Sequence, residues 1–132
     1  MKISFVNGCF DVLHPGHIEL LKYARSFGDY LIVAIDSDRK VAEMKGPERP
    51  IFSQYDRTVM LKAIRYVDVV HVFDTKEDLE QLLESIQPDI MVVGSDWKGK
   101  EVVGAQYAKE VKFYDRVGEY STTKTLQGVA YR

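Results

Sequence analysis

Short apolar runs alternate along this chain with segments of helical period. The runs have the length of buried strands, and the segments between them place apolar residues every three or four positions, which is typical of parallel strands joined by crossover helices. We expect strands at 3–6, 30–35, 68–73, 89–93 and 110–114, and helices at 15–27, 54–65, 76–86 and after 121–123. The pattern predicts an α/β fold, a Rossmann-like doubly wound parallel sheet of about five strands.

The turns that follow the strands hold most of the unusual polar residues. Open parallel sheets bind ligands outside the carboxyl ends of their strands, so these turns are the expected ligand edge. Segment 36–53 loses its periodicity at "MKGPERP" and is predicted to be a functional loop, with Lys45 free to move over a polyphosphate. The other turns lie at 7–17, 94–101 and 115–123.

Composition narrows the class of protein. The chain has 132 residues, 45% of them hydrophobic and 29% charged, which suits one globular domain over 1–132. A net charge of -2 offers no broad basic face for nucleic acid, so a small phosphorylated ligand is favoured.

Cys9 is the only cysteine, which excludes an intrachain disulfide and multi-cysteine zinc sites and favours a reducing cytoplasm. The apolar run at the start is too short for a signal peptide, and no stretch approaches the roughly 20 apolar residues that span a bilayer. We therefore expect no membrane partner.

His14 and His17 stand in a turn with two glycines and Pro15, in "GCFDVLHPGH". Proline suits the first helical position, so both imidazoles should lie at the positive end of a helix dipole and act as an anion site. A shared metal ion is less favoured because Asp11 is the one nearby carboxylate, and a helix cap is the structural alternative. Cys9 is better suited to packing than to nucleophilic attack.

Several cations and polar groups accompany the histidines. Arg57 and Arg65 are ordinary surface residues when taken singly, and an ion pair between Arg65 and Asp68 is as reasonable as a ligand role. Asp96 could bind a ribose or a base, and Trp97 could stack or pack. Ser121-Thr122-Thr123 could cap a helix and bind a second anion.

Two motifs resemble those of the cytidylyltransferase-like nucleotidyltransferases. "GCFDVLHPGH" is similar to their Gly-x-Phe-Asp-x-x-His-x-Gly-His signature, and "RVGEYSTT" is similar to Arg-Thr-Glu-Gly-Ile-Ser-Thr-Thr. "DYLIVAIDSD", "IRYVDVV" and "GSDWKGK" resemble glycerol-3-phosphate cytidylyltransferases. "KGPERP", "FDTKEDLEQLLESIQPDIMVVGSD" and "GKEVVGAQY" resemble instead the adenylyltransferase domain that makes ADP-heptose from heptose 1-phosphate.

The resemblance implies a transfer in which an alcohol or sugar phosphate attacks the α-phosphate of a nucleoside triphosphate and releases pyrophosphate. Mg²⁺ would sit on the phosphates, with no direct protein ligand and no covalent intermediate. The implied catalytic residues are His14, His17, Lys45, Ser121 and Thr122. The implied nucleotide-binding residues are Gly8, Cys9, Phe10, Gly16, Asp96, Arg116 and Thr123. The implied acceptor-binding residues are Asp11, Asp38, Arg57 and Arg65.

Arg116 stands five residues before Ser121, as in the cytidylyltransferase signature, which favours CTP and glycerol 3-phosphate. The alternatives are ATP with a heptose 1-phosphate, and a nucleotide-binding regulator without turnover. Small members of the family are homodimers, so a homodimer is also expected.

Overall fold

The structure is a computed structural model that describes residues 1–116 and 120–131. Five parallel strands form one sheet in the order β3-β2-β1-β4-β5. Their bounds are β1 (Ile3–Gly8), β2 (Tyr30–Asp36), β3 (Val69–Phe73), β4 (Ile90–Gly94) and β5 (Glu110–Tyr114). The order reverses beside β1, as in a doubly wound sheet, so the predicted α/β class and strand number are confirmed.

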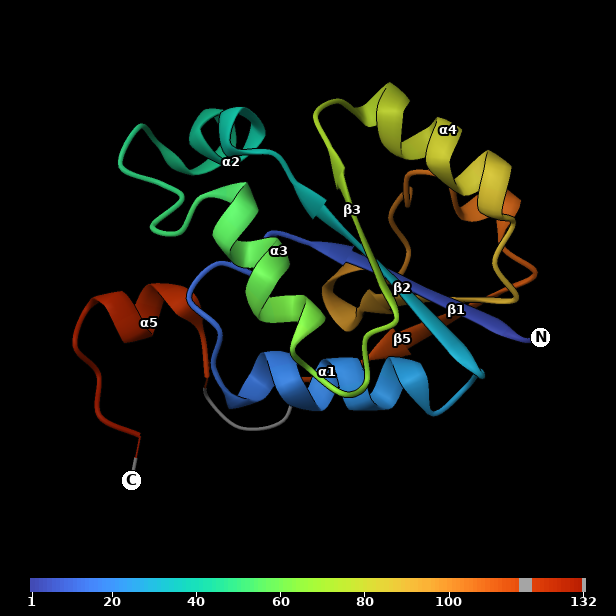
Figure 1. Ribbon diagram of the computed structural model, residues 1–132, viewed down its shortest axis with the longest axis horizontal. Coiled ribbons are helices and arrows are strands. Elements are labelled where there is room, and N and C mark those ends of the chain that lie inside the picture. Colours follow the sequence, from blue (N-terminus) through green and yellow to red (C-terminus); the bar gives the residue numbers. More distant parts are fainter. Residues whose placement is uncertain (117–119, 132) are drawn as a thin grey trace.

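Helices cover both faces of the sheet, as Figure 1 shows. They are α1 (Pro15–Arg25), α2 (Asp38–Lys45), α3 (Gln54–Lys62), α4 (Lys76–Ile86) and α5 (Thr122–Leu126), with short 3-10 helices η1 (Ser95–Trp97) and η2 (Ala105–Tyr107). Helices α1 and α3 lie on one face and α4 on the other. In the described part of the chain, no helix is long and apolar enough to cross a membrane.

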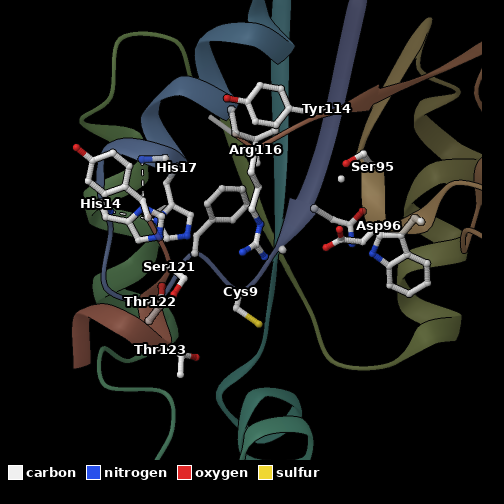
Figure 2. Close-up of a pocket in the computed structure, with 18 of the residues that line it drawn as sticks. Cys9, His14, His17, Ser95, Asp96, Tyr114, Arg116, Ser121, Thr122 and Thr123 are labelled. Carbon is white, nitrogen blue, oxygen red and sulfur yellow. Dashed lines mark hydrogen bonds between the residues drawn. The ribbon is translucent and has the colours of Figure 1, made fainter. Parts of the chain in front are cut away.

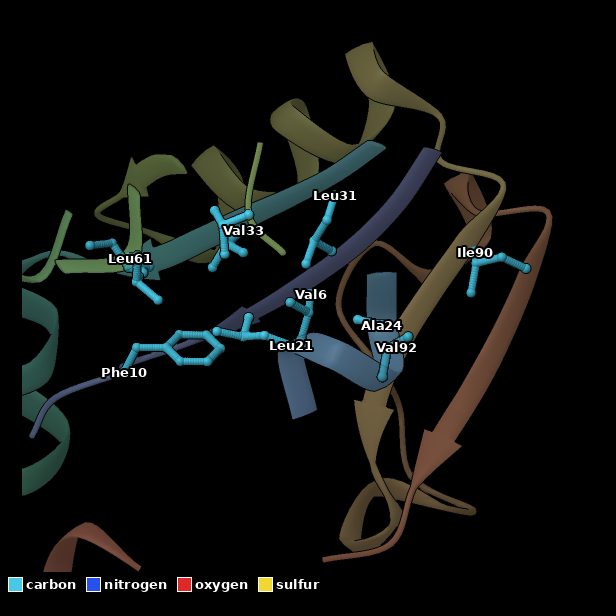
Figure 3. Close-up of a cluster of buried hydrophobic side chains, with 11 residues drawn as sticks. Val6, Phe10, Leu21, Ala24, Leu31, Val33, Leu61, Ile90 and Val92 are labelled. Carbon is cyan, nitrogen blue, oxygen red and sulfur yellow. The ribbon is translucent and has the colours of Figure 1, made fainter. Parts of the chain in front are cut away.

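Alternate residues of each central strand supply two cores. Val6 and Val33 pack against Leu21 and Ala24 of α1 (Figure 3). Phe5 and its neighbours on the opposite face pack against α4. Because β1, β2 and β4 are covered on both faces, their sequences are continuous apolar runs rather than alternating ones.

Segment 36–53 is not the single loop that the sequence predicted. Residues 38–45 form α2, whose start is capped by Ser37: its side chain accepts a hydrogen bond from the Lys40 N–H (3.1 Å). Only Val41 of this helix is buried, so the segment carries almost no apolar periodicity for sequence reasoning to detect. Lys45 therefore lies in the last turn of a helix.

The other predicted elements differ from the structure at their ends. Helix α1 stops at Arg25 and α3 stops at Lys62, whereas the sequence extended them to 27 and 65. Strand β1 runs on to Gly8, which brings the strand directly into the histidine turn. The carboxyl ends of the strands lie on the side of the sheet where Figure 1 shows α2 and α5.

Candidate active site

A cavity of about 340 Å³ opens at the carboxyl ends of β1 and β4. Its lining includes every residue that was predicted to take part in catalysis or nucleotide binding. These are Gly8, Cys9, Phe10, His14, Gly16, His17, Lys45, Asp96, Arg116, Ser121, Thr122 and Thr123. Residues far apart in the sequence thus meet at one edge of the sheet, as the fold class requires.

The two histidines cap α1 and face each other. His14 is the N-cap: its Nδ1 accepts a hydrogen bond from the Gly16 N–H (3.1 Å), and its own N–H donates to His17 Nδ1 (3.2 Å). Their rings stack with centroids 3.9 Å apart. Since both Nδ1 atoms accept hydrogen bonds, each neutral ring carries its proton on Nε2 and can donate it to a ligand.

The pKa values of both imidazoles lie below the usual value. Burial lowers the pKa of His17 to about 4, with further contributions from the charges of His14, Lys45 and Arg116. Burial and the charge of Arg116 also lower the pKa of His14. At neutral pH both rings are therefore uncharged hydrogen-bond donors.

Gly16 permits this arrangement because no side chain fits in its place. A Cβ there would lie 2.9 Å from Cε1 and 3.0 Å from Nδ1 of His14, and 3.2 Å from Cβ of Tyr120. The turn before the helix is also constrained: Phe10 (φ 50°) and Val12 (φ 52°) both adopt the left-handed region. A β-branched residue such as Val12 is strained there, and such strain persists only where surrounding contacts enforce it.

Asp11 provides those contacts. Its carboxylate is almost fully buried and accepts hydrogen bonds from the N–H groups of Ile51 (2.7 Å) and Phe52 (3.0 Å) and from Nε of Arg49 (3.2 Å). Burial raises the pKa of Asp11, but these hydrogen bonds outweigh that effect and lower it overall. Asp11 thus joins the histidine turn to the segment before α3.

Arg57 stabilises the end of β1, just before the histidine turn, from the interior of the protein. It is fully buried, and its guanidinium donates to the carbonyl oxygens of Cys9 (2.9 Å), Asp36 (2.7 Å) and Phe52 (3.0 Å). It also pairs with the Asp38 carboxylate (2.9 Å), which accepts from the Gln54 N–H as well (2.6 Å). These bonds connect the ends of β1 and β2 to α3.

The four predicted acceptor-binding residues lie outside the cavity lining. Asp11, Asp38 and Arg57 take part in the network just described. Arg65 is exposed and donates to the Tyr66 hydroxyl (2.9 Å). The suggested pair with Asp68 does not form; Asp68 pairs with Arg25 instead (3.4 Å). Acceptor binding by these four residues stays a prediction.

Cationic and hydroxyl groups surround the remaining space. Figure 2 shows the Arg116 guanidinium reaching into the space between the histidines and Asp96, with Ser121 and Thr122 below the histidines. Ser121 caps α5, as predicted, and Thr122 Oγ1 donates to the Asp11 carbonyl oxygen (2.8 Å). The start of α5 is thereby held against the histidine turn.

Sequence reasoning missed Tyr120, which lines the cavity with its ring 5.9 Å from that of His14. It also packs against Tyr131, whose hydroxyl donates to the Ser121 carbonyl oxygen (3.1 Å) and accepts from the Ser121 N–H (3.3 Å). The available signal was the tyrosine standing where the family signature has isoleucine.

Among the described residues, no group of three or more His, Cys, Asp or Glu side chains could hold a metal ion. Asp96 is the one carboxylate in the described lining of the cavity. The paired imidazole donors, Lys45 and Arg116 have instead the hydrogen-bonding and charge properties that suit a phosphate chain.

The comparisons with known proteins agree with this class of site. The family model described as Cytidylyltransferase-like matches residues 5–126, and the chain belongs to that family. It is 46% identical over 97% of its length to "Bifunctional protein HldE" of Sulfurimonas denitrificans, and 46% identical over 95% to the protein of that name from Campylobacter fetus. The chain spans 27% of the length of each of these relatives.

Two solved structures have a similar fold. The lipopolysaccharide core biosynthesis protein from Thermoplasma volcanium has a TM-score of 0.67 and 26% identity, covering 92% of this chain and 99% of that one. Pantothenate synthetase from Thermus thermophilus has a TM-score of 0.66 at 15% identity, covering 95% of this chain and 61% of that one, which supports the fold alone. The protein is an enzyme of the nucleotidyltransferase type.

Proposed function

We propose that this chain transfers the adenylyl group of ATP to a heptose 1-phosphate and releases pyrophosphate. The observation that carries the proposal is the alignment of nearly the whole chain with proteins named HldE at 46% identity. It agrees with "KGPERP" and "GKEVVGAQY", the stretches that resemble the heptose 1-phosphate adenylyltransferase domain. The structural relative named for lipopolysaccharide core biosynthesis also suits a sugar phosphate acceptor.

This proposal takes the place of CTP and glycerol 3-phosphate, which the sequence favoured on the position of Arg116. Arg116 lines the same cavity as His14 and His17, and Figure 2 shows its guanidinium in the space beside the imidazoles. A cation at that end of the cavity is suited to bind phosphate oxygens rather than a base. The position of Arg116 therefore does not favour CTP over ATP.

The reaction that we propose is an in-line displacement. An oxygen of the acceptor phosphate forms a bond to the α-phosphorus, and the bond from that phosphorus to the bridging oxygen of the β-phosphate breaks. The electron pair leaves with pyrophosphate, and no protein group forms a covalent bond. Such a reaction depends on positioning and on charge stabilisation.

Each group of polar residues in the cavity would have a separate role in this reaction. The Nε2–H groups of His14 and His17 would donate to oxygens of the reacting phosphate, where charge develops. Lys45 and Arg116 would neutralise the phosphate chain, and the Ser121 hydroxyl would donate to the leaving phosphates. Mg²⁺ would enter bound to the triphosphate as part of the substrate, because the described lining offers it one carboxylate, Asp96.

Pyrophosphate release tests the proposal. The protein is incubated with magnesium and ATP or CTP, each with heptose 1-phosphate, glycerol 3-phosphate or no acceptor. Release that requires both ATP and heptose 1-phosphate supports it. Release with CTP and glycerol 3-phosphate alone contradicts it, and nucleotide-induced thermal stabilisation without any release indicates a regulator.

We further propose that the enzyme acts as a homodimer in the cytoplasm. Light scattering coupled to size-exclusion chromatography checks the dimer. A mass equal to that of one 15.1 kDa chain would contradict it.

A further inference from the structure

A second cavity of about 420 Å³ adjoins the nucleotide cavity at the same edge of the sheet. The two share the backbone turn at Gly8 and Cys9 and, across it, Gly94 and Trp97. A ligand in the second cavity would therefore approach the phosphate site from the side of β2 and β3. The catalytic arrangement described above uses none of the polar groups on that side.

Asp36 and Lys40 form a fixed polar pair in this cavity. Asp36, at the end of β2, is only 5% exposed; its Oδ2 accepts a hydrogen bond from the Cys9 thiol (3.4 Å), and its Oδ1 lies 3.7 Å from Lys40 Nζ. Lys40 Nζ also lies 5.9 Å from the centre of the Phe73 ring. The carboxylate and the ammonium group are thus held side by side at the cavity wall.

The protonation state of the Cys9 thiol maintains its hydrogen bond to Asp36. Burial, and next the negative charge of Asp36, raise the pKa of the thiol to about 11. The thiol therefore stays protonated and continues to donate to Asp36. In Figure 2 its sulfur points away from His14 and His17, which agrees with a supporting role at the boundary between the cavities.

The chemistry of the wall favours a hydroxylated anion. Its charged lining residues are Asp36, Lys40 and Lys76, which give a net positive charge, and the half-exposed Trp97 supplies aromatic surface. A carboxylate beside an ammonium group offers an acceptor and donors to neighbouring hydroxyl groups. Aromatic surface suits the C–H faces of a sugar ring.

We propose that Asp36 and Lys40 determine acceptor specificity by binding hydroxyl groups of the sugar phosphate. The inference rests on the proposed function, since it assigns this cavity to the sugar whose phosphate attacks at the neighbouring one. One hydroxyl group of the sugar donates a hydrogen bond to the Asp36 carboxylate, and a neighbouring hydroxyl group accepts a hydrogen bond from the Lys40 ammonium group. Its phosphate extends past Gly8 and Cys9 towards the histidines.

The variants Asp36→Asn and Lys40→Met test the inference. Binding of heptose 1-phosphate is measured by calorimetry on protein saturated with a non-hydrolysable ATP analogue, and KM values for ATP and the sugar phosphate are measured alongside. Loss of a charged hydrogen bond should raise the Kd and the KM for the sugar phosphate about tenfold or more. The KM for ATP should change less than about twofold.

Two controls separate recognition from structure. Glu43→Gln breaks an exposed ion pair with Arg39 on the same helix (2.6 Å) and should change neither constant. Methyl phosphate, which has the phosphate but no hydroxyl group, should bind wild type and Asp36→Asn equally. Thermal denaturation confirms that each variant is folded.

Unchanged binding of heptose 1-phosphate in both folded variants would overturn the inference and leave the proposed function intact. A raised KM for ATP with an unchanged KM for the sugar phosphate would also overturn it, because the cavity would then serve the nucleotide. If wild type neither binds nor uses heptose 1-phosphate, the proposed function fails and the inference fails with it.

Discussion

The backbone N–H of His14 donates to Nδ1 of His17 while the two imidazole rings stack 3.9 Å apart. The pair both closes the first turn of α1 and lines the cavity at the carboxyl ends of β1 and β4. Each ring can do this only when neutral, since Nδ1 must remain an acceptor. The stability of the first turn of α1 and the proposed catalytic role therefore require the same protonation state.

We expect the free energy of unfolding to fall on mild acidification because of His17. The unfolded imidazole takes up a proton below pH 6.5, whereas the folded one does so only near pH 4, so the unfolded state binds more protons in between. The loss should reach about 2 kcal/mol between pH 7.5 and pH 5. Urea unfolding at both pH values measures it.

His17→Gln keeps an N3 side chain that can accept the same hydrogen bond but does not titrate. The stability difference between wild type and this variant should shrink by about 2 kcal/mol from pH 7.5 to pH 5. A difference that does not depend on pH would show that His17 is protonated in the folded state as readily as in the unfolded one.

His17→Ala should lower kcat by about 10²-fold or more, because the transition state loses a fixed hydrogen-bond donor. Steady-state pyrophosphate release measures this. The matched control is His71→Ala, since His71 is exposed on β3 and lies outside both cavities. Equal activity of both variants would refute the role given to His17.

Gly16→Ala should reduce kcat although it adds a single methyl group. The new Cβ would meet the His14 ring at 2.9 Å and displace it from the stack. Catalytic groups displaced by about 1 Å commonly cost 10²-fold in rate. Ser85→Thr adds a methyl group at an exposed position of α4 outside both cavities and serves as the control; full activity of Gly16→Ala would contradict the packing described.

Asp11→Asn should lower the free energy of unfolding by about 2 to 4 kcal/mol, because an amide cannot accept all three buried hydrogen bonds. Urea unfolding measures the loss. Asp29→Asn, which alters an exposed carboxylate that accepts the Lys2 N–H, should cost less than about 0.5 kcal/mol. Full stability with a raised KM for the acceptor would instead place Asp11 in the substrate site.

The sequence was sufficient where a local signal was strong. Apolar runs marked the strands, and Pro15 marked the start of α1, so the edge where ligand groups meet followed from the fold. Helix α2 could not be predicted because Val41 is its one buried residue, which leaves no apolar periodicity. The helix is stabilised instead by its Ser37 cap and by contacts distant in sequence, such as the hydrogen bond from the Asp38 N–H to Gln54. Periodicity cannot report such contacts.

The site shows the same division. Motif residues such as His14 and Ser121 could be assigned to the cavity, because their spacing carries the information. The burial of Arg57 could not be predicted, because its hydrogen-bond partners Cys9 and Asp36 lie 48 and 21 residues away in the sequence. Isolated arginines are usually exposed, and only the folded chain distinguishes this one.

The identity of the product tests the central claim most directly. The protein is given equal concentrations of ATP, CTP, heptose 1-phosphate and glycerol 3-phosphate with magnesium, and the products are identified by mass spectrometry. We expect an ADP-heptose to accumulate together with an equal amount of pyrophosphate, and His17→Ala to form it about 10²-fold more slowly. Accumulation of CDP-glycerol in its place would contradict the assignment.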